Sequence, residues 1–383
     1  MKYFIIAGEA SGDIHGAQLI RSIKRLDAYA KFSFFGGDLM ADACSTQPVV
    51  HYRDMAYMGF IEVIKHLRTI LGFMDTAKKI IDTSAPDAII LIDYPSFNLK
   101  IAKYAHSRGI DTYYFISPKV WAWKEYRVKQ IKKYITKLFS ILPFETEFFA
   151  RHHYAVQYVG NPTVKEISDA KRKFCSDDEF RKRNSLSDKP ILALVPGSRK
   201  KEILDNLPVM VKAASRFPQF QMVIAGAPSI DKGFYSQVLS AEDITTEISV
   251  LQGQSFQLIA SSKVALVTSG TATLETAVLG TPQVVCYRMG GSRLLYLLYK
   301  LLLKVKYVSL PNLIVGREII PELLLHKCNE DRIASEIRLL TSDTTEYRNM
   351  IDGYCEMLFR LGDNDCTDTA AHLLIDSLSK DID

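Results

Sequence analysis

Short, continuous apolar runs alternate with helix-length amphipathic segments along most of the chain, and this alternation limits the fold more than any other feature. Continuous apolar runs indicate strands that are buried on both faces, and a helix after each strand indicates parallel pairing. The sequence therefore predicts an α/β protein with doubly wound parallel sheets. The predicted strands are 3–7, 32–35, 88–92, 112–116, 138–142 and 156–159, then 191–195, 221–225, 264–267 and 283–287.

A highly charged stretch divides the chain into two halves. From residue 165 to residue 189, 14 of 25 residues are charged, against 24% of the whole chain. No strand pattern survives there, and Pro190 precedes a fresh apolar run. We therefore expect a first Rossmann-like domain over 1–165, a linker over 166–189, a second Rossmann-like domain over 190–345 and a helical tail over 346–383.

Composition and charge exclude several classes of protein. The 383 residues are 48% hydrophobic, and 48 Lys and Arg against 43 Asp and Glu give a net charge of +5. This excess is compatible with anionic ligands but is far from the footprint of a nucleic-acid-binding domain. The longest apolar stretch, residues 294–303, is about half of the roughly 20 residues that span a bilayer. The N-terminal apolar run is too short for a signal peptide. Six cysteines without paired spacing fit a reducing cytosol better than a disulfide framework or a zinc site.

Two loops of the first half follow predicted strands and carry candidate site residues. In the turn after the first strand, Gly8 and Gly12 permit a tight backbone, and Ser11 can cap the next helix. Such a helix start favours an anionic ligand, although a plain strand-to-helix turn is the alternative. Asp93 ends the apolar strand 88–92. Because ligands of open α/β sheets bind beyond the carboxyl ends of strands, Asp93 is a candidate general base, with a cap or loop acid as the alternative.

Pro196–Arg199, directly after strand 191–195, is a candidate phosphate site in the second half. The turn at Gly197 and Ser198 supplies backbone N–H groups, and Arg199 adds a bidentate donor suited to phosphate. A solvated arginine in an ordinary turn is the alternative.

The segment 269–275, after strand 264–267, is more informative. Gly270 lets the backbone approach a ligand, and Thr271 and Thr273 place hydroxyl and N–H groups at a helix start that suits a pyrophosphate. Glu275 lies one helical turn beyond Thr271, where its carboxylate can accept hydrogen bonds from both hydroxyls of a ribose. An ordinary capping arrangement is the alternative, but with the turn at Arg199 the pattern favours a nucleoside-diphosphate site.

Three stretches have aromatic or amphipathic character. Both tryptophans lie in 117–123, past a strand end, where they suit either sugar or acyl packing or the core. The stretches 58–71 and 294–306 combine apolar and basic residues, and we expect either a membrane or acyl contact or a core-facing helix. In the first of these two, the candidate contact residues are Phe60, Ile64, Lys65 and Arg68.

Six motifs, taken in order, resemble the lipid-A-disaccharide synthase family, over residues 3 to about 330. The motifs are 7–13, 58–63, 117–123, 196–199, 269–275 and 307–312. The resemblance implies a GT-B glycosyltransferase: two Rossmann-like domains with the active site between them, and neither a cofactor nor a catalytic metal.

The resemblance also implies an activity and a place in the cell. Such enzymes join UDP-2,3-diacylglucosamine to 2,3-diacylglucosamine 1-phosphate, releasing UDP and forming the β(1→6) disaccharide 1-phosphate of lipid A. We therefore expect a cytoplasmic enzyme of a Gram-negative bacterium that associates peripherally with the inner membrane. A homodimer is expected as well, and the tail returns either to the first domain or to a partner chain.

Residue roles carry over by motif. The resemblance assigns UDP to Arg199, to the turn 269–273 and to Glu275, with Asn312 nearby. It assigns the acceptor cleft to Gly8, Glu9, Ser11 and Gly12, and the catalytic base to Asp93. The family often has a second acid where this chain has Ser96, which leaves Asp93 as the acid of that loop.

Two alternatives stay open on the sequence. One is another GT-B enzyme acting on UDP-N-acetylglucosamine, such as a 2-epimerase or a muramyl-lipid transferase. The other is a peripheral membrane-binding module that only retains nucleotide affinity.

Overall fold

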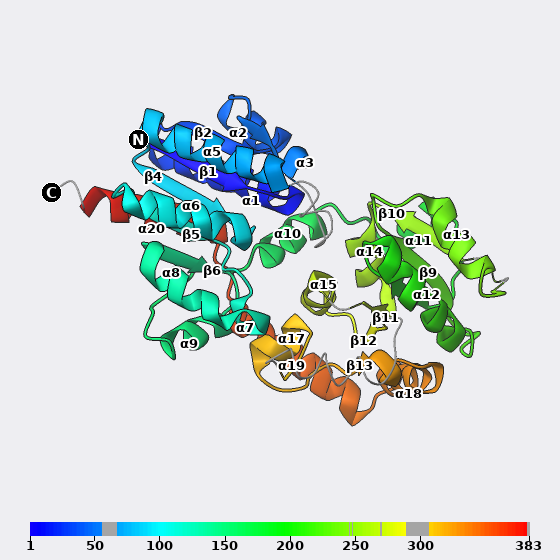
Figure 1. The fold of residues 1–383 in the computed structure, drawn as a ribbon. Helices are drawn as coiled ribbons and strands as arrows, with labels where there is room; N and C mark the ends of the chain where they lie inside the picture. The colour runs from blue at the N-terminus through cyan, green and yellow to red at the C-terminus, as the bar shows by residue number, and fades with distance from the viewer. Residues whose placement is uncertain (56–66, 245, 247, 269, 289–305, 381–383) are drawn as a thin grey trace. The chain divides into compact units, whose positions relative to one another are not determined.

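The chain forms two compact units in the computed structural model, which describes residues 1–55, 67–244, 246, 248–268, 270–288 and 306–380 (Figure 1). The first unit consists of Met1–Pro162 together with Asp363–Asp383, and the second of Thr163–Gly362.

The first unit is built on a seven-stranded parallel sheet in the order β3-β2-β1-β4-β5-β6-β7. The chain winds outward from β1 to β3 and then returns to the other side of β1, so the winding reverses between β1 and β4. In open α/β sheets this reversal is where ligands bind. Its strands are β1 (Lys2–Ala7), β2 (Lys31–Gly36), β3 (Val50–His51), β4 (Ala88–Ile92), β5 (Thr112–Phe115), β6 (Lys137–Ser140) and β7 (Gln157–Tyr158).

Helices cover both faces of this sheet, which explains why its central strands are apolar throughout. Tyr3 and Ile5 of β1 pack on one side, with α1 and α20, whereas Phe4 and Ile6 pack on the other, with α5, α6 and α8. The helices are α1 (Ala10–Leu26), α2 (Asp38–Cys44), α3 (Tyr52–Met55), α5 (Leu67–Ser84), α6 (Pro95–Ser107), α7 (Val120–Trp123), α8 (Val128–Tyr134), α9 (Phe144–Ala150) and α20 (Cys366–Lys380), with a 3-10 turn at Glu125–Arg127.

The second unit repeats this design with a six-stranded parallel sheet in the order β10-β9-β8-β11-β12-β13, and its winding reverses between β8 and β11. Its strands are β8 (Ile191–Val195), β9 (Gln221–Gly226), β10 (Ser249–Gln252), β11 (Ser262–Val267), β12 (Gln283–Tyr287) and β13 (Glu322–Leu324). Its helices are α10 (Pro162–Lys171), α11 (Asp177–Arg183), α12 (Lys200–Ala214), α13 (Lys232–Ser240), α14 (Ser255–Ala260), α15 (Thr271–Leu279), α17 (Leu310–Val315), α18 (Glu330–Thr341) and α19 (Thr345–Leu361).

These two sheets confirm the predicted doubly wound α/β class. Each of the ten predicted strands overlaps a strand of the structure, whereas β3, β10 and β13 were not predicted. The charged stretch expected to be a linker contains α11 and most of α10. Helix α11 begins with three acidic residues and ends with three basic ones, which complements the helix dipole. Its Phe180 is buried in the core of the second unit.

The last residues of the chain divide between the units. Helix α19 belongs to the second unit, whereas α20 packs on α1 of the first (Figure 1). There Ser22 Oγ donates a 2.6 Å hydrogen bond to Asp368, which also pairs with Arg25.

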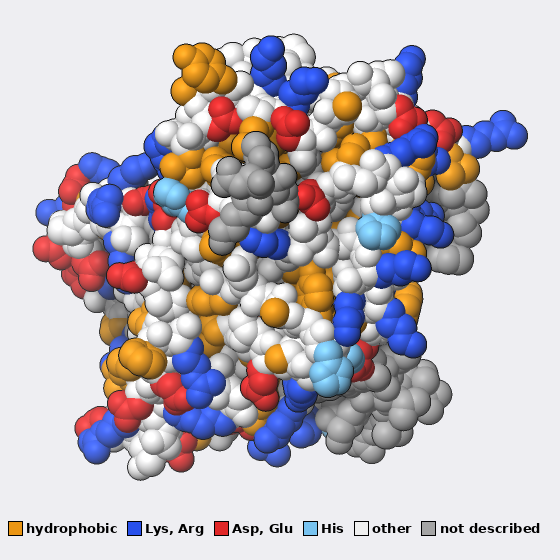
Figure 2. All heavy atoms as spheres, turned by 90° about the vertical axis from the view of Figure 1, so that its left-hand side faces the viewer, with side chains coloured by type: hydrophobic (Ala, Val, Ile, Leu, Met, Phe, Trp, Pro, Cys, Tyr) orange, Lys and Arg blue, Asp and Glu red, His pale blue; other side chains and the backbone are white. Residues whose placement is uncertain are grey.

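The surface carries mixed charge. On the face drawn in Figure 2, Lys and Arg side chains lie among Asp and Glu side chains. Within the described ranges, no helix is long and apolar enough to cross a membrane.

Candidate functional site

The loops after β1 and β4 meet where the winding of the first sheet reverses. The register pairs Ala7 with Ile92, so both loops leave the sheet side by side. Gly8 lies directly against the ring of Tyr94, because a Cβ at Gly8 would come within 2.5 Å of Tyr94 Cγ. Gly8 therefore allows the first turn to pack on the turn that carries Asp93.

Asp93 stands in an unusual turn. Asp93 and Tyr94 have φ angles of 45° and 47°, in the left-handed region that non-glycine residues rarely adopt. The Asp93 carbonyl oxygen accepts a 2.7 Å hydrogen bond from Asn98 Nδ2 and another from the Tyr114 hydroxyl. Backbone strain that the surroundings hold in place is characteristic of functional sites.

The electrostatics of Asp93 suit a residue that exchanges a proton. Burial raises the pKa of its carboxyl above the ordinary value, while the positive charge of Lys119 and a backbone hydrogen bond from Tyr94 act in the opposite direction. Perturbed carboxyls at the carboxyl end of a central strand are candidates for acid–base chemistry.

The other predicted residues of the first turn lie at the start of α1. Glu9 is the N-cap, and its carbonyl oxygen accepts from the Asp13 backbone N–H at 3.0 Å. Ser11 is exposed, whereas Gly12 is buried against Ala7. Asp13 does not cap its own helix; its carboxylate accepts from the backbone of Gly37 and Met40 and so fixes the start of α2.

The loop 117–123 is held by a buried carboxyl that sequence reasoning missed. Glu145 of α9 is 1% exposed and accepts a 2.8 Å hydrogen bond from Trp121 Nε1. Its other oxygen accepts from Ser140 Oγ, which also lies 2.9 Å from the Leu142 carbonyl oxygen. Burial raises the pKa of Glu145 to about 7, against the opposing effect of these hydrogen bonds and of Lys119.

In the second unit, the turns after β8 and β11 also meet at the reversal point. Val195 pairs with Val267, and the Thr268 N–H donates to the Val195 carbonyl oxygen at 2.9 Å. The two turns predicted to bind phosphate thus lie together at the reversal point of the second sheet, and the loop with Asp93, the predicted base, lies at that of the first.

The Pro196–Arg199 turn already holds an anion, the carboxylate of Glu202. Gly197 has φ 110°, which favours glycine, and the backbone N–H groups of Ser198 and Arg199 donate to Glu202 Oε2 at 3.0 and 3.3 Å. Arg199 Nη1 also pairs with Glu202 Oε1 at 2.7 Å, and its side chain remains 68% exposed. Glu202 was not predicted; its role depends on the turn geometry.

The segment after β11 contains both exposed and buried residues. Gly270, with φ 142°, and Thr271 are exposed at the start of α15. Thr273 is buried, and its hydroxyl donates to the Gly270 carbonyl oxygen at 2.8 Å, so this side chain closes the helix start from within. Burial and the nearby Glu166 raise the pKa of Glu275 to about 7. Ser269 lies outside the described residues.

Asn312 differs from its predicted role as a nucleotide contact. It is 0% exposed, and its amide nitrogen donates to the Ile320 carbonyl oxygen and to Glu322 at 2.9 and 2.8 Å. Its amide oxygen accepts from the backbone N–H groups of Ile319 and Ile320. Because an asparagine amide has two donors and two acceptor sites, every hydrogen-bonding group of this side chain is committed inside the protein.

The stretch predicted to contact membrane or acyl chains is only partly described. Phe60, Ile64 and Lys65 lie outside the described residues. Arg68 is exposed on the first turn of α5, Leu71 is 47% exposed, and Met74 on the following turn is buried.

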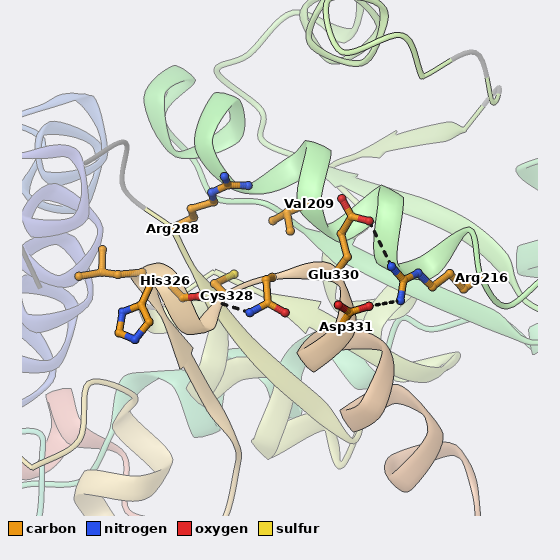
Figure 3. A pocket seen from close by; sticks show the side chains of 9 residues that line it. Val209, Arg216, Arg288, His326, Cys328, Glu330 and Asp331 are labelled. Carbon is orange, nitrogen blue, oxygen red and sulfur yellow. Dashed lines mark hydrogen bonds and ion pairs between the residues drawn. The ribbon is translucent and has the colours of Figure 1, made fainter. Parts of the chain in front are cut away.

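A pocket of about 330 Å³ lies elsewhere in the second unit and includes none of the predicted residues (Figure 3). Arg288 and His326, which follow β12 and β13, contribute to its lining. On one side of it Arg216 pairs with Glu330 and Asp331, at 3.3 and 2.7 Å (Figure 3). The charge of Arg216 is therefore already compensated by two carboxylates of the protein.

Comparison with known proteins decides the family. Residues 3–372 match the family described as lipid-A-disaccharide synthetase. The chain belongs to this family. It is therefore an enzyme, a glycosyltransferase of lipid A biosynthesis.

Relatives of this family match over nearly their whole length. The lipid-A-disaccharide synthase of Myxococcus xanthus is 35% identical over 382 residues, which cover 98% of this chain and 97% of the relative. The lipid-A-disaccharide synthase of Geobacter sulfurreducens is 33% identical over 386 residues, which cover 100% of this chain and 98% of the relative.

Solved structures agree in fold. The UDP-GlcNAc 2-epimerase of Neisseria meningitidis superposes with a TM-score of 0.67 at 11% identity, covering 99% of this chain and 100% of that one. The UDP-N-acetylglucosamine 2-epimerase of Rickettsia bellii gives 0.64 at 12%, covering 99% and 97%. At this identity the likeness concerns the fold alone, and it confirms the predicted GT-B architecture.

Proposed function

We propose that this chain is an inverting glycosyltransferase that joins UDP-2,3-diacylglucosamine to 2,3-diacylglucosamine 1-phosphate. The products are UDP and the β(1→6) tetraacyl disaccharide 1-phosphate. Family membership supports the reaction class. The observation that carries the mechanism is the place of Asp93, whose backbone is held in a left-handed turn where the winding of the first sheet reverses.

The acceptor hydroxyl needs a base when it attacks the sugar. In this proposal Asp93 accepts the proton of the acceptor 6-hydroxyl as the new bond forms. Lys119 favours the ionised form of Asp93, which a base requires, while burial keeps its pKa above the ordinary value and its basicity high. An α-linked donor and a β-linked product require a single in-line displacement, with positive charge developing on the donor sugar.

Negative charge develops on UDP as it leaves, and in this proposal positive groups of the second unit stabilise that charge. The Arg199 guanidinium has five N–H donors, of which its ion pair with Glu202 engages one. The exposed start of α15 at Gly270 and Thr271 adds backbone N–H groups and the positive end of the helix dipole. Glu275 accepts from the ribose hydroxyls in this proposal. UDP is a good leaving group, so no general acid is assigned.

The cellular setting follows from the substrates. We place the enzyme in the cytoplasm, peripherally on the inner membrane, where two acylated substrates are available. The exposed Arg68 and Leu71 on one end of α5 support this placement. We also propose a homodimer.

The base assignment is tested with Asp93→Asn, which keeps the size of the side chain and removes its basicity. Transfer should fall by a factor of about 10² to 10⁴, the usual contribution of a general base, while UDP affinity stays unchanged. Asp75→Asn, an exposed acid on α5, is the matched control and should retain full activity. Retention of more than about a tenth of the activity by Asp93→Asn would mean that another group takes the proton.

A further inference from the structure

Three cations lie on residues 116–127, the segment that follows β5. They are Lys119, Lys124 and Arg127, and no described Asp or Glu forms an ion pair with any of them. Many other arginines of the chain do pair, among them Arg108, Arg216 and Arg348. These three side chains therefore keep hydrogen-bond donors that no direct ion pair with a described residue occupies, although the charge of Lys119 also acts on Asp93 and Glu145.

Two of these cations are placed around the Asp93 turn. Arg127 Nη2 donates a 2.9 Å hydrogen bond to Ser96 Oγ, three residues after Asp93. Lys119 is exposed and lies close enough to interact electrostatically with Asp93. Lys124 lies over the Trp123 ring, with its Nζ 3.9 Å from the ring centroid.

Buried contacts of Val120 and Trp121 fix the segment to the first unit. Val120 is 2% exposed, and Trp121 is fixed by Glu145 and by an edge-to-face contact with Phe144 at 5.0 Å. A cation on a segment tethered in this way loses less conformational freedom when it binds a ligand.

The chemistry of the cluster indicates a phosphate monoester. The guanidinium fork and the ammonium groups match the oxygens and the double charge of a phosphate. Trp123 and Tyr126, which are 61% and 64% exposed, flank the cations with aromatic faces on which a sugar ring can pack.

We propose that Lys119 and Arg127, supported by Lys124, form the binding site for the anomeric phosphate of the acceptor sugar. This inference rests on the proposed function, because it takes the acceptor to be a sugar phosphate whose hydroxyl reaches Asp93. One hexose ring separates the phosphate from the reacting 6-hydroxyl, so the phosphate has to be bound close to Asp93. Lys119 interacts with Asp93, and Arg127 bonds Ser96 in the same loop, so both are placed to bind it.

Binding is measured first, without any transfer reaction. Both tryptophans of the chain, Trp121 and Trp123, lie in this segment, so tryptophan emission reports on it. Glucosamine 1-phosphate should change the emission saturably, and glucosamine should not. Lys119→Met with Arg127→Met should weaken binding of glucosamine 1-phosphate by at least about tenfold, since hydrogen bonds to charged groups are the stronger class.

Two variants control this measurement. Lys103→Met removes one exposed charge from α6, the helix that begins beside Ser96, and should bind as the wild type does. Lys119→Arg with Arg127→Lys keeps the charges and should restore most of the affinity. Equal affinity in the double Met variant and the wild type, an equal response to glucosamine, or equal weakening by Lys103→Met would each overturn the proposal.

A kinetic arm separates this inference from the proposed function. In the double Met variant the KM for the phosphorylated acceptor should rise about tenfold or more, and the KM for the UDP-sugar should stay the same. The KM for dephosphorylated acceptor should rise far less in the variant than the KM for the phosphorylated acceptor, whereas the loss of the Lys119 charge beside Asp93 lowers kcat for both acceptors alike. If the wild type forms no disaccharide at all, the proposed function fails, and the emission titration still decides whether the phosphate site exists.

Discussion

Glu145→Gln should make the first unit less sensitive to pH. Ser140 Oγ has one proton but lies within hydrogen-bond distance of two acceptors, Glu145 Oε2 and the Leu142 carbonyl oxygen. When Glu145 is neutral, its own proton can bond Ser140 Oγ, which frees the Ser140 proton for Leu142, while the other carboxyl oxygen accepts from Trp121. The glutamine amide reproduces both contacts without a titrating proton. The variant should therefore keep the fold and lose one source of pH dependence.

The expected change in the free energy of unfolding follows from the pKa of Glu145. Burial raises the pKa of Glu145 from 4.5 to about 7, so between these values the folded state holds a proton that the unfolded state has released. Stability therefore falls as pH rises through this window and is constant above about pH 7. Of the interval from pH 5.5 to pH 8.5, only the part below pH 7, about 1.5 pH units, changes the stability. At about 1.4 kcal/mol per unit, the wild-type free energy of unfolding falls by about 2 kcal/mol over this interval.

Urea unfolding followed by tryptophan emission measures this effect, because both tryptophans lie in the first unit. The wild type should lose about 2 kcal/mol more than Glu145→Gln between the two pH values. Glu147→Gln, an exposed acid two residues away on α9, should behave as the wild type. The same pH dependence in Glu145→Gln and the wild type would refute a buried, neutral Glu145.

Three further outcomes are expected. UDP affinity should rise about tenfold from pH 6 to pH 8, because Glu275, with a pKa of about 7, accepts from the ribose only when ionised. The Glu275→Gln variant should bind UDP weakly and with the same affinity across this range. A rise in its affinity like that of the wild type would exclude this role of Glu275. Transfer should continue at full rate in EDTA, and loss of activity that Mg²⁺ restores would contradict the mechanism. Lys65→Glu with Arg68→Glu should keep UDP affinity and reduce sedimentation with anionic liposomes, since each basic residue near the surface contributes about 1 kcal/mol; high salt should mimic the variant, and undiminished sedimentation would exclude membrane docking by this segment.

Central strands could be predicted because they are buried on both faces and therefore read as unbroken apolar runs. Strands β3 and β13 are two and three residues long, which is too short for any pattern to distinguish them from loops. The charged stretch before residue 190 was expected to be a linker because its charges hide the buried Phe180 of α11.

Spacing located the loops of the site but not the direction of each side chain. Thr273 and Asn312 belong to the predicted loops, yet both are buried and hydrogen-bonded within the protein. Glu202 and Glu145 could not be found from spacing, since their roles depend on the folded turn and on Trp121, 24 positions away in the sequence.

The most direct test of the account is product formation by the purified chain with UDP-2,3-diacylglucosamine and 2,3-diacylglucosamine 1-phosphate, the linkage being assigned by NMR. The account predicts one UDP for each tetraacyl disaccharide 1-phosphate formed, with a β(1→6) linkage. Absence of the disaccharide, or an α linkage at the new bond, would contradict an inverting transfer assisted by Asp93.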